Sequence, residues 1–238
     1  MRLPVGPDTQ LVLDLDDTLY PEIDFVASGF RAVARALGER APSVGPGLLP
    51  AMWERYQAGQ NAFAWAAEHL AAHGVHVSVA AMLRCYRTHD PDIAPGPGVR
   101  RFLDDVVALG AGVSLLTDGR SITQRNKVRA LGLTRYLTDL VISEEVGVGK
   151  PDARSYRLLE ERHPGKRFVC IADNTAKDFV VPARLGWRSV CLRDTGRHIH
   201  PQHPHPDPRP DHVVDSFEEI VVVAAGPTAA AAEAPRHR

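Results

Sequence analysis

Two aspartates, Asp14 and Asp16, stand at the end of a short apolar run and are the first candidates for chemistry in this chain. The run Leu11-Val-Leu-Asp-Leu-Asp-Asp-Thr-Leu19 is typical of a buried strand whose polar residues begin where the strand ends. Side chains two positions apart on a strand share a face, so we expect both carboxylates to point at one place. Like charges are tolerated this close together when a cation lies between them or one carboxyl keeps its proton. The pair predicts metal binding, acid–base chemistry or both, whereas a strand followed by a polar turn is the alternative if no partners exist.

Such partners follow later apolar runs of the chain. In a parallel sheet the carboxyl ends of the strands meet at one edge, which is where ligands bind. A hydroxyl and an ammonium group facing several carboxylates suit a phosphoryl group beside a divalent ion, because hard oxygen atoms bind Mg²⁺ and a carboxylate can act as nucleophile. The candidates at this edge, besides the first pair, are Thr18, Thr117, Asp118, Lys150, Asp173 and Asp178.

The elements that must position these residues alternate between strand and helix from residue 95 onward. Repeated alternation predicts an α/β fold with a doubly wound, Rossmann-like parallel sheet covered on both faces. Pro151 suits the first turn of one of the helices. The expected strands are 112–117, 138–142, 167–172, 187–192 and 213–214, the expected helices are 99–109, 122–131, 151–162 and 175–185, and a last short element is expected at 217–222.

Residues 21–94 have a different character, with alanine-rich patterns of helical period. We expect one helix from about residue 24 to Gly38, a Pro/Gly loop over 41–50, and three further helices, the last behind a Ser78 cap. This predicts a helical bundle inserted into a strand-led core, with the aromatic residues in the bundle interior. The predicted domains are 1–20 and 95–224 for the core, 21–94 for the bundle and 225–238 for a disordered tail.

Composition narrows the class of protein. The 238 residues are 44% hydrophobic and 24% charged with a net charge of -1, which gives no electrostatic basis for binding nucleic acid or an anionic membrane. The N-terminus lacks the pattern of a signal peptide, and no window approaches the ~20 apolar residues of a membrane span. The three cysteines are widely spaced and typical of small buried residues in a reducing compartment. We expect a cytoplasmic protein with a small phosphorylated metabolite as partner, and the oligomeric state stays open.

A histidine- and proline-rich stretch covers residues 195–211. It contains His198, His200, His203 and His205, but no acidic or cysteine partner stands at a spacing typical of metal ligands. The prolines favour an extended, solvated loop over a metal site.

The strand-end residues resemble the four motifs of the haloacid dehalogenase (HAD) superfamily. They occur in family order across about residues 10–215, and the helical block lies where the phosphatase branch of that family carries its alpha-helical (C1-type) cap. Ala172 stands where a glycine is usual, so we expect the backbone beside Asp173 to differ slightly. The matching segments are Asp14-Leu-Asp16-Asp-Thr18, Leu116-Thr117-Asp-Gly, Lys150-Pro and Ile171-Ala-Asp173-Asn-Thr-Ala-Lys-Asp178.

This resemblance implies a Mg²⁺-dependent phosphatase that acts through an aspartyl phosphate. By analogy, Asp14 attacks phosphorus, and Asp16 protonates the leaving oxygen and later deprotonates water. The implied metal ligands are Asp14, the backbone carbonyl of Asp16, and Asp173. The implied phosphate-binding residues are Thr117, Asp118 and Lys150. Thr18 and Asp178 are expected to orient the groups that make these direct contacts.

Other functions fit the sequence less well. A dehalogenase needs no acid at position 16, and the phosphonate-cleaving route needs a cap lysine, whereas the first lysine of this chain is Lys127. A nucleotide-binding P-loop fails because Glu144 stands at its first glycine and Pro151 at its Ser/Thr. A signal-receiver domain carries its phosphorylated aspartate on a later strand and has no inserted bundle.

A sugar phosphomutase on the same core and a non-catalytic protein that binds a phosphorylated ligand stay open as alternatives. Contacts from the cap would decide the substrate, because a cap that closes over the site usually supplies them. The polar cap residues that could face the site are Arg31, Arg35, Arg55, Gln57, Asn61 and Arg84.

Overall fold

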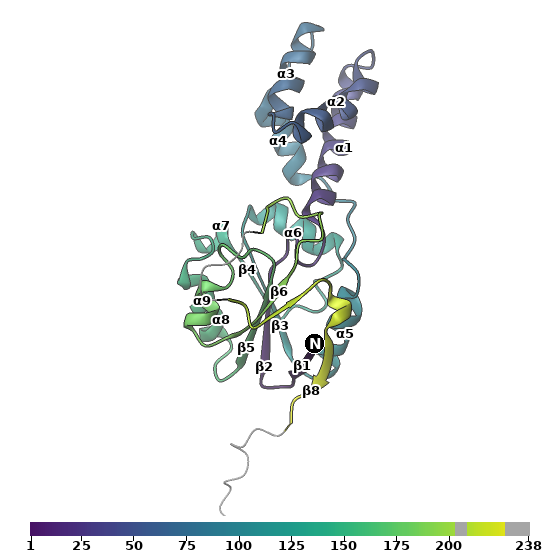
Figure 1. The fold of residues 1–238 in the computed structure, drawn as a ribbon. Helices are drawn as coiled ribbons and strands as arrows, with labels where there is room; N and C mark the ends of the chain where they lie inside the picture. The colour runs from purple at the N-terminus through teal and green to yellow at the C-terminus, as the bar shows by residue number, and fades with distance from the viewer. Residues whose placement is uncertain (203–208, 227–238) are drawn as a thin grey trace, which may run out of the picture.

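A six-stranded parallel sheet forms the centre of the molecule in the computed structural model, which describes residues 1–202 and 209–226 (Figure 1). Its strand order is β4-β3-β2-β5-β6-β7, and every pairing is parallel. The chain proceeds from β2 to β3 and β4 on one side and then to β5 on the other, so the order reverses at β2. The predicted doubly wound α/β core is confirmed. The strands are β2 (Thr9–Leu13), β3 (Gly112–Thr117), β4 (Asp139–Ile142), β5 (Arg167–Ala172), β6 (Arg188–Leu192) and β7 (His212–Val214).

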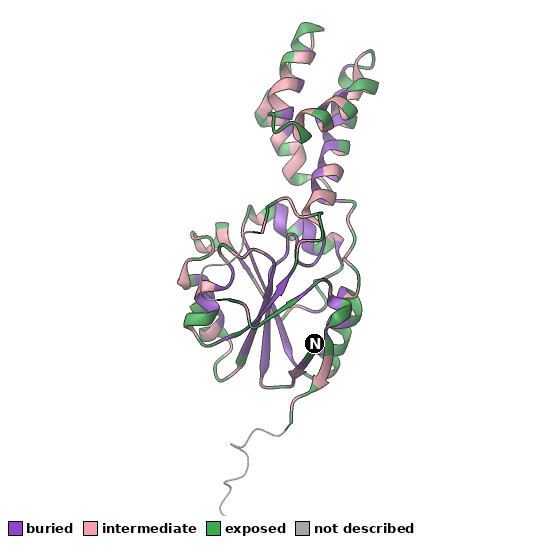
Figure 2. Cartoon of the chain, viewed as in Figure 1, coloured by how far each residue is buried: buried purple, intermediate pink, exposed green. Residues whose placement is uncertain are grey.

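Alternate residues of β2 send their side chains to opposite faces of the sheet. Leu11 and Leu13 join a buried cluster that includes residues of α5 and α6. Val12 joins a second cluster that includes residues of α8 and the start of α9. Both faces are therefore covered, and the central strands are buried throughout (Figure 2). The helices of the core are α5 (Val99–Ala108), α6 (Ser121–Ala130), the short α7 (Ser143–Val146), α8 (Ala153–Arg162) and α9 (Val180–Arg184).

A two-stranded parallel sheet that the sequence did not predict joins the two ends of the core. It pairs β1 (Arg2–Val5) with β8 (Val221–Ala224), and a 3-10 turn, η1 (Phe217–Glu219), precedes β8. The single element expected at 217–222 is therefore two. Strands of four residues whose partners stand over 200 positions apart leave too weak a local pattern to predict. Ala225 still bonds Val5 through its backbone N–H, one residue into the predicted tail, while 227–238 lie outside the described residues.

Four helices between β2 and α5 project from the core as an inserted cap (Figure 1). The predicted Ser78 cap is confirmed, because its hydroxyl accepts the backbone N–H of Ala81 at 3.2 Å. The loop expected over 41–50 is wrong in its second half, since a helix begins at Gly45. Pro46 sits in its first turn, where the missing N–H has no helical partner to lose. The helices are α1 (Glu22–Arg40), α2 (Gly45–Gln57), α3 (Ala62–Ala72) and α4 (Val79–Thr88).

Aromatic rings fill the cap interior. Phe30 of α1 lies 5.7 Å from Tyr56 and 5.6 Å from Phe63, ring centroid to ring centroid, in edge-to-face geometry. Phe25, one turn earlier on α1, belongs instead to the core cluster. The first helix of the cap is thus anchored in the core as well as in the bundle. The exact domain limits stay a prediction.

In residues 1–202 and 209–226 no helix has both the length and the apolar character that crossing a bilayer requires. Cys85, Cys170 and Cys191 are all free thiols.

The close approach of α1 to α4 gives a stability prediction. A Cβ atom on Gly29 would lie 2.4 Å from two ring carbons of the half-buried Tyr86, whereas one on Gly47 of α2 would meet nothing within 4 Å. Gly29→Ala should therefore lower the free energy of unfolding by about 1–3 kcal/mol through overpacking. Gly47→Ala should leave it unchanged or raise it by up to about 1 kcal/mol. Urea denaturation followed by circular dichroism measures both, and equal effects of the two variants would contradict the packing described here.

Candidate active site

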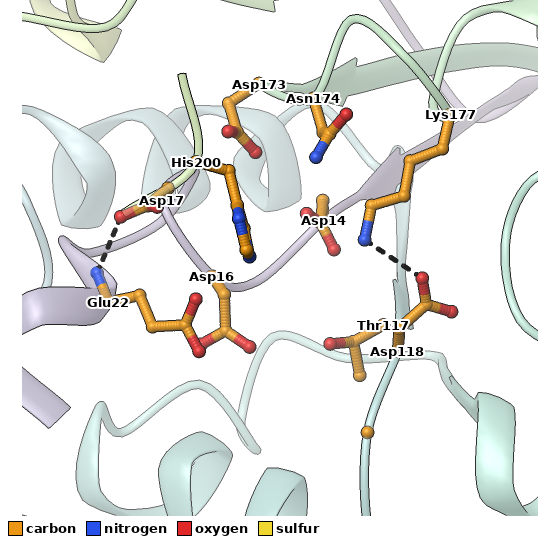
Figure 3. A pocket seen from close by; sticks show the side chains of 11 residues that line it. Asp14, Asp16, Asp17, Glu22, Thr117, Asp118, Asp173, Asn174, Lys177 and His200 are labelled. Carbon is orange, nitrogen blue, oxygen red and sulfur yellow. Dashed lines mark hydrogen bonds and ion pairs between the residues drawn. The ribbon is translucent and has the colours of Figure 1, made fainter. Parts of the chain in front are cut away.

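The nucleophile predicted from the sequence, Asp14, directly follows β2 at the carboxyl edge of the sheet. Its backbone N–H continues the ladder by donating to the carbonyl of Ile171 at 3.0 Å. Asp17 then turns the chain with a φ of 55°, so Asp16 lies on a loop and not on an extension of the strand. Both Asp14 and Asp16 nevertheless line one cavity of about 250 Å³ (Figure 3).

Lys150 lies between two buried carboxylates. Its Nζ is 2.7 Å from Asp14 Oδ1 and 2.8 Å from Asp178 Oδ1, and its side chain is only 2% exposed. Burial lowers the pKa of Lys150, but the two carboxylates outweigh burial and raise it well above its ordinary value. Burial and the neighbouring charges of Asp178 and Asp173 raise the pKa of Asp14 to about 8, although Lys150 opposes them.

Three carboxylates gather at a position suited to a cation. Oxygen atoms of Asp14, Asp173 and Asp178 lie within 4.8 Å of one another, and all three residues are buried. Thr18 donates its hydroxyl to Asp173 Oδ1 at 3.1 Å and so holds that carboxylate in place. The set consists of hard oxygen atoms, and it places more negative charge together than Lys150 neutralises. These residues therefore fit a divalent ion of the Mg²⁺ class.

Asp16 has a different environment, because its carboxylate accepts from three donors. Lys127 Nζ lies 2.7 Å from Oδ1, Gln124 Nε2 lies 2.9 Å from Oδ2, and the Tyr20 hydroxyl also donates to Oδ1. Burial raises the pKa of Asp16, but Lys127 and these hydrogen bonds outweigh it, so the pKa lies below its ordinary value. The Asp16 side chain faces these donors and is not one of the three clustered carboxylates. Its predicted role as a ligand through the backbone carbonyl stays a prediction.

Lys127 is a residue that sequence reasoning did not place in the site. It comes from α6, is 3% exposed, and lies 3.7 Å from Glu22 Oε1 as well as beside Asp16. Its Nζ is 4.3 Å from the centroid of the Phe25 ring. Burial, with the charge of Asp16, raises the pKa of Glu22 to about 7. The buried ammonium group of Lys127 thus lies close to two carboxylates of the cavity, those of Asp16 and Glu22.

The last residue of β3 adds a hydroxyl, and the loop after it adds another acid. Thr117 is buried, and its hydroxyl accepts from Gln124 Nε2 at 2.6 Å. Asp118 accepts the backbone N–H of Lys150 at 3.0 Å with one oxygen and lies 3.0 Å from Lys177 Nζ with the other. Thr117, Asp118 and Lys177 line the cavity, whereas Lys150, which contacts Asp14, is not part of the lining. The lysine on the open side of the nucleophile is therefore Lys177, which sequence reasoning also missed.

Two predicted helix starts are wrong, and both corrections matter to the site. The helix expected at 175–185 begins at Val180, and residues before it form a turn in which Asn174 donates its N–H to Asp178 Oδ2 at 3.0 Å. This turn brings Asp178 back under Asp14 and leaves Lys177 facing the cavity. The helix expected from Pro151 begins at Ala153, because the Asp152 side chain caps it by accepting the Arg154 N–H at 2.9 Å.

The histidine-rich stretch also reaches the site, so its assignment as a solvated loop is wrong in part. His198 has a side chain only 9% exposed, with Nδ1 3.3 Å from Asp173 Oδ2. His200 is exposed but lines the cavity (Figure 3). His203 and His205 lie outside the described residues.

The polar cap residues singled out earlier do not line this cavity, to which the cap contributes Glu22. Arg31 pairs with Asp92 at 3.2 Å, and Asn61 caps α3 by accepting the Ala64 N–H. Arg55 lies 5.3 Å from the centroid of the Trp65 ring. These three side chains are engaged within the cap or with its connection to the core.

Comparison with known proteins identifies relatives along most of the chain. The haloacid dehalogenase-like hydrolase family model matches residues 10–183. The phosphoserine phosphatase of Thermus thermophilus is 30% identical, over 90% of this chain and 98% of that protein. The glyceraldehyde 3-phosphate phosphatase of Methanocaldococcus jannaschii is 23% identical, over 89% of this chain and 94% of that protein.

Solved structures share the fold at low identity. The HAD-hydrolase YfnB from Bacillus subtilis, bound to magnesium, has a TM-score of 0.59 at 20% identity and covers 89% of this chain and 96% of its own. The L-2-haloacid dehalogenase from Xanthobacter autotrophicus has a TM-score of 0.52 at 18% identity, with 88% and 95% covered. At these identities the likeness extends to the fold alone.

The carboxylate cluster predicts that Mg²⁺ stabilises the folded protein. Saturating MgCl₂ at about 100 times the dissociation constant should add about 2.7 kcal/mol and raise the melting temperature. Asp173→Asn should abolish most of that rise, while Asp105→Asn should keep it, because Asp105 is an exposed residue of α5 that pairs with Arg101. Without metal, Asp173→Asn should change the stability little, because it relieves repulsion with Asp14 and Asp178 but removes the charge that faces His198. Thermal denaturation with and without EDTA measures this, and an equal Mg²⁺ response of both variants would rule out the cluster as the metal site.

Proposed function

Because the chain belongs to the haloacid dehalogenase-like hydrolases, we propose that it hydrolyses a small phosphomonoester with Mg²⁺ as cofactor and an aspartyl phosphate at Asp14 as intermediate. The observation that carries the proposal is the placement of Asp14, which lines the cavity on one side and contacts Lys150 on the other. The family membership and the two phosphatase relatives support a phosphoric monoester hydrolase.

In the first half of the reaction, an oxygen of the Asp14 carboxylate forms a bond to phosphorus while the bond from phosphorus to the leaving oxygen breaks. Lys150 orients Asp14 from behind and offsets the charge of the buried carboxylates. Thr117 and Lys177 face the cavity, where they can hold the phosphoryl oxygens. A metal held by Asp14, Asp173 and Asp178 would neutralise charge on the phosphoryl group and would favour the ionised form of Asp14, whose pKa is otherwise raised. Asp16, which is ionised in the resting site, takes up the proton of a phosphomonoester that binds as its monoanion and passes it to the leaving alcohol.

In the second half, Asp16 takes a proton from water as the water oxygen attacks phosphorus, and phosphate leaves with the Asp14 carboxylate restored. The lowered pKa of Asp16 suits this step, because the group is then ionised and ready to accept the proton. Lys127, Gln124 and Tyr20 fix its orientation toward the cavity rim. Asp16 also favours hydrolysis of a phosphoester over dehalogenation, in which the leaving halide needs no proton.

The substrate class follows from the size and polarity of the cavity. At about 250 Å³, lined almost wholly by polar side chains, it suits a small polar metabolite phosphate. The relatives named above act on a phosphorylated amino acid and a phosphorylated three-carbon sugar, according to their names. A small phosphorylated metabolite as substrate, and a cytoplasmic location, stay predictions.

Phosphate release from a panel of phosphomonoesters tests the proposal. The panel contains O-phosphoserine, glyceraldehyde 3-phosphate, nucleoside monophosphates and p-nitrophenyl phosphate, each with Mg²⁺ or EDTA. Asp14→Asn should lower kcat by on the order of a thousandfold or more, because it removes the nucleophile, while Asp105→Asn should act as the wild type. Release that continued in Asp14→Asn or in EDTA would refute the mechanism, and no release from any substrate by the wild type would refute the hydrolase function.

A further inference from the structure

The histidine segment, which we define as Arg193–Gln202, follows β6 and lies against both the core and the cap. It ends next to the residues of the carboxylate cluster, since Gln202 Nε2 donates to the backbone carbonyl of Asp173 at 2.7 Å. In Figure 3 the ring of His200 lies among Asp17, Asp16 and Asp14, on the side of the cavity opposite Lys177. The segment therefore supplies one wall of the site.

This wall is held by its own hydrogen bonds. Asp194 Oδ1 accepts the backbone N–H groups of Gly196, Arg197 and His198 at 2.7–3.1 Å. Gln202 donates to the carbonyl of Leu192 at 2.6 Å and accepts the N–H of Asp194 at 2.9 Å. The segment is thus a closed loop whose ends are fixed to β6, which gives His200 a defined place.

The histidine segment is also attached to the cap. Arg197 lies 2.7 Å from Asp24 of α1, and Ile199 packs against the hydrophobic cluster of the cap. The N–H of Ile199 donates to Asp17 Oδ2 at 2.8 Å, while Asp17 Oδ1 accepts the N–H of Glu22 at 2.7 Å. One carboxylate therefore joins the start of the cap to the segment, so both stand around the mouth of the cavity together.

The chemistry of the lining assigns different parts of a substrate to different residues. Six acidic residues line the cavity, and the nitrogen-bearing side chains among its lining are Lys177, Asn174 and His200. Lys177 Nζ lies 3.0 Å from Asp118 Oδ2, and in the proposed function it holds a phosphoryl oxygen. His200 lies on the other side of the nucleophile, among carboxylates, and no hydrogen bond within the described chain occupies its imidazole. An imidazole can donate to or accept from a hydroxyl group and can donate to a carboxylate.

We propose that His200 contacts the leaving group of the substrate and selects phosphomonoesters whose alcohol carries a further hydroxyl or carboxylate group. This inference rests on the proposed function and extends it, because it assigns specificity to the histidine segment and not to the polar faces of the cap helices. The engagement of Arg31, Arg55 and Asn61 elsewhere supports that assignment.

His200→Ala and His200→Gln test the proposal, with His212→Ala on the exposed face of β7 as the matched control. His200 is exposed, and circular dichroism verifies the fold of each variant. The first test substrate is the panel member with a polar alcohol that the wild type turns over best. On this substrate His200→Ala should lower kcat/KM about fivefold to tenfold, mainly by raising KM. A loss of this size corresponds to one neutral hydrogen bond. His200→Gln should keep part of the affinity that His200→Ala loses, because the glutamine amide can still donate a hydrogen bond.

For p-nitrophenyl phosphate, whose leaving group carries neither a hydroxyl nor a carboxylate, His200→Ala should change kcat/KM by less than about twofold. His212→Ala should leave both substrates unchanged. An equal loss on both substrates, or no loss on either, would overturn the role of His200 while leaving the hydrolase function intact. Failure of the wild type to release phosphate from any substrate would instead refute the proposed function itself.

Discussion

The contact of one buried ammonium group with two buried carboxylates determines the arrangement of this site. Lys150 lies within 2.8 Å of both Asp14 and Asp178, and all three side chains are almost fully removed from water. Removing only the ammonium group or only the carboxylates would leave the remaining charge unpaired in a medium of low polarity, which typically costs about 3–5 kcal/mol. The nucleophile is therefore held in one orientation, with a cation behind it and the cavity in front. The excess negative charge that remains favours a metal ion at the same place.

The sheet topology explains how distant residues reach this contact. Asp14 follows β2, Thr117 ends β3, Asp173 follows β5, and the order of strands reverses at β2, where a crevice forms at the carboxyl edge. The cap begins within the loop that carries Asp16, so its first helix and the histidine segment share Asp17 as a hydrogen-bond acceptor. The catalytic residues, the cap and the histidine segment are thus linked through a few buried carboxylates.

Much of this could be predicted from the sequence, because buried strands followed by acids and a helix-period insertion leave strong local patterns. The residues that were missed depend on tertiary placement. Lys127 and Gln124 lie on α6, and no local sequence pattern shows which face of this helix meets the site. Lys177 lies in a turn before α9, where the sequence predicts a helix. Composition held one usable signal: the chain has only four lysines among its 28 basic residues, and three of them, Lys127, Lys150 and Lys177, lie at the site.

The central claim is that Asp14 becomes phosphorylated during turnover. The direct measurement is to quench the wild-type protein with acid milliseconds after it meets a turned-over substrate, reduce it with borohydride, and sequence the tryptic peptides by mass spectrometry. An acyl phosphate is reduced to an alcohol, so the account predicts homoserine in place of aspartate at position 14, and at that position alone among Asp14, Asp16 and Asp17. Substrate turnover with no modified residue at position 14, or with the modification at Asp16, would contradict it.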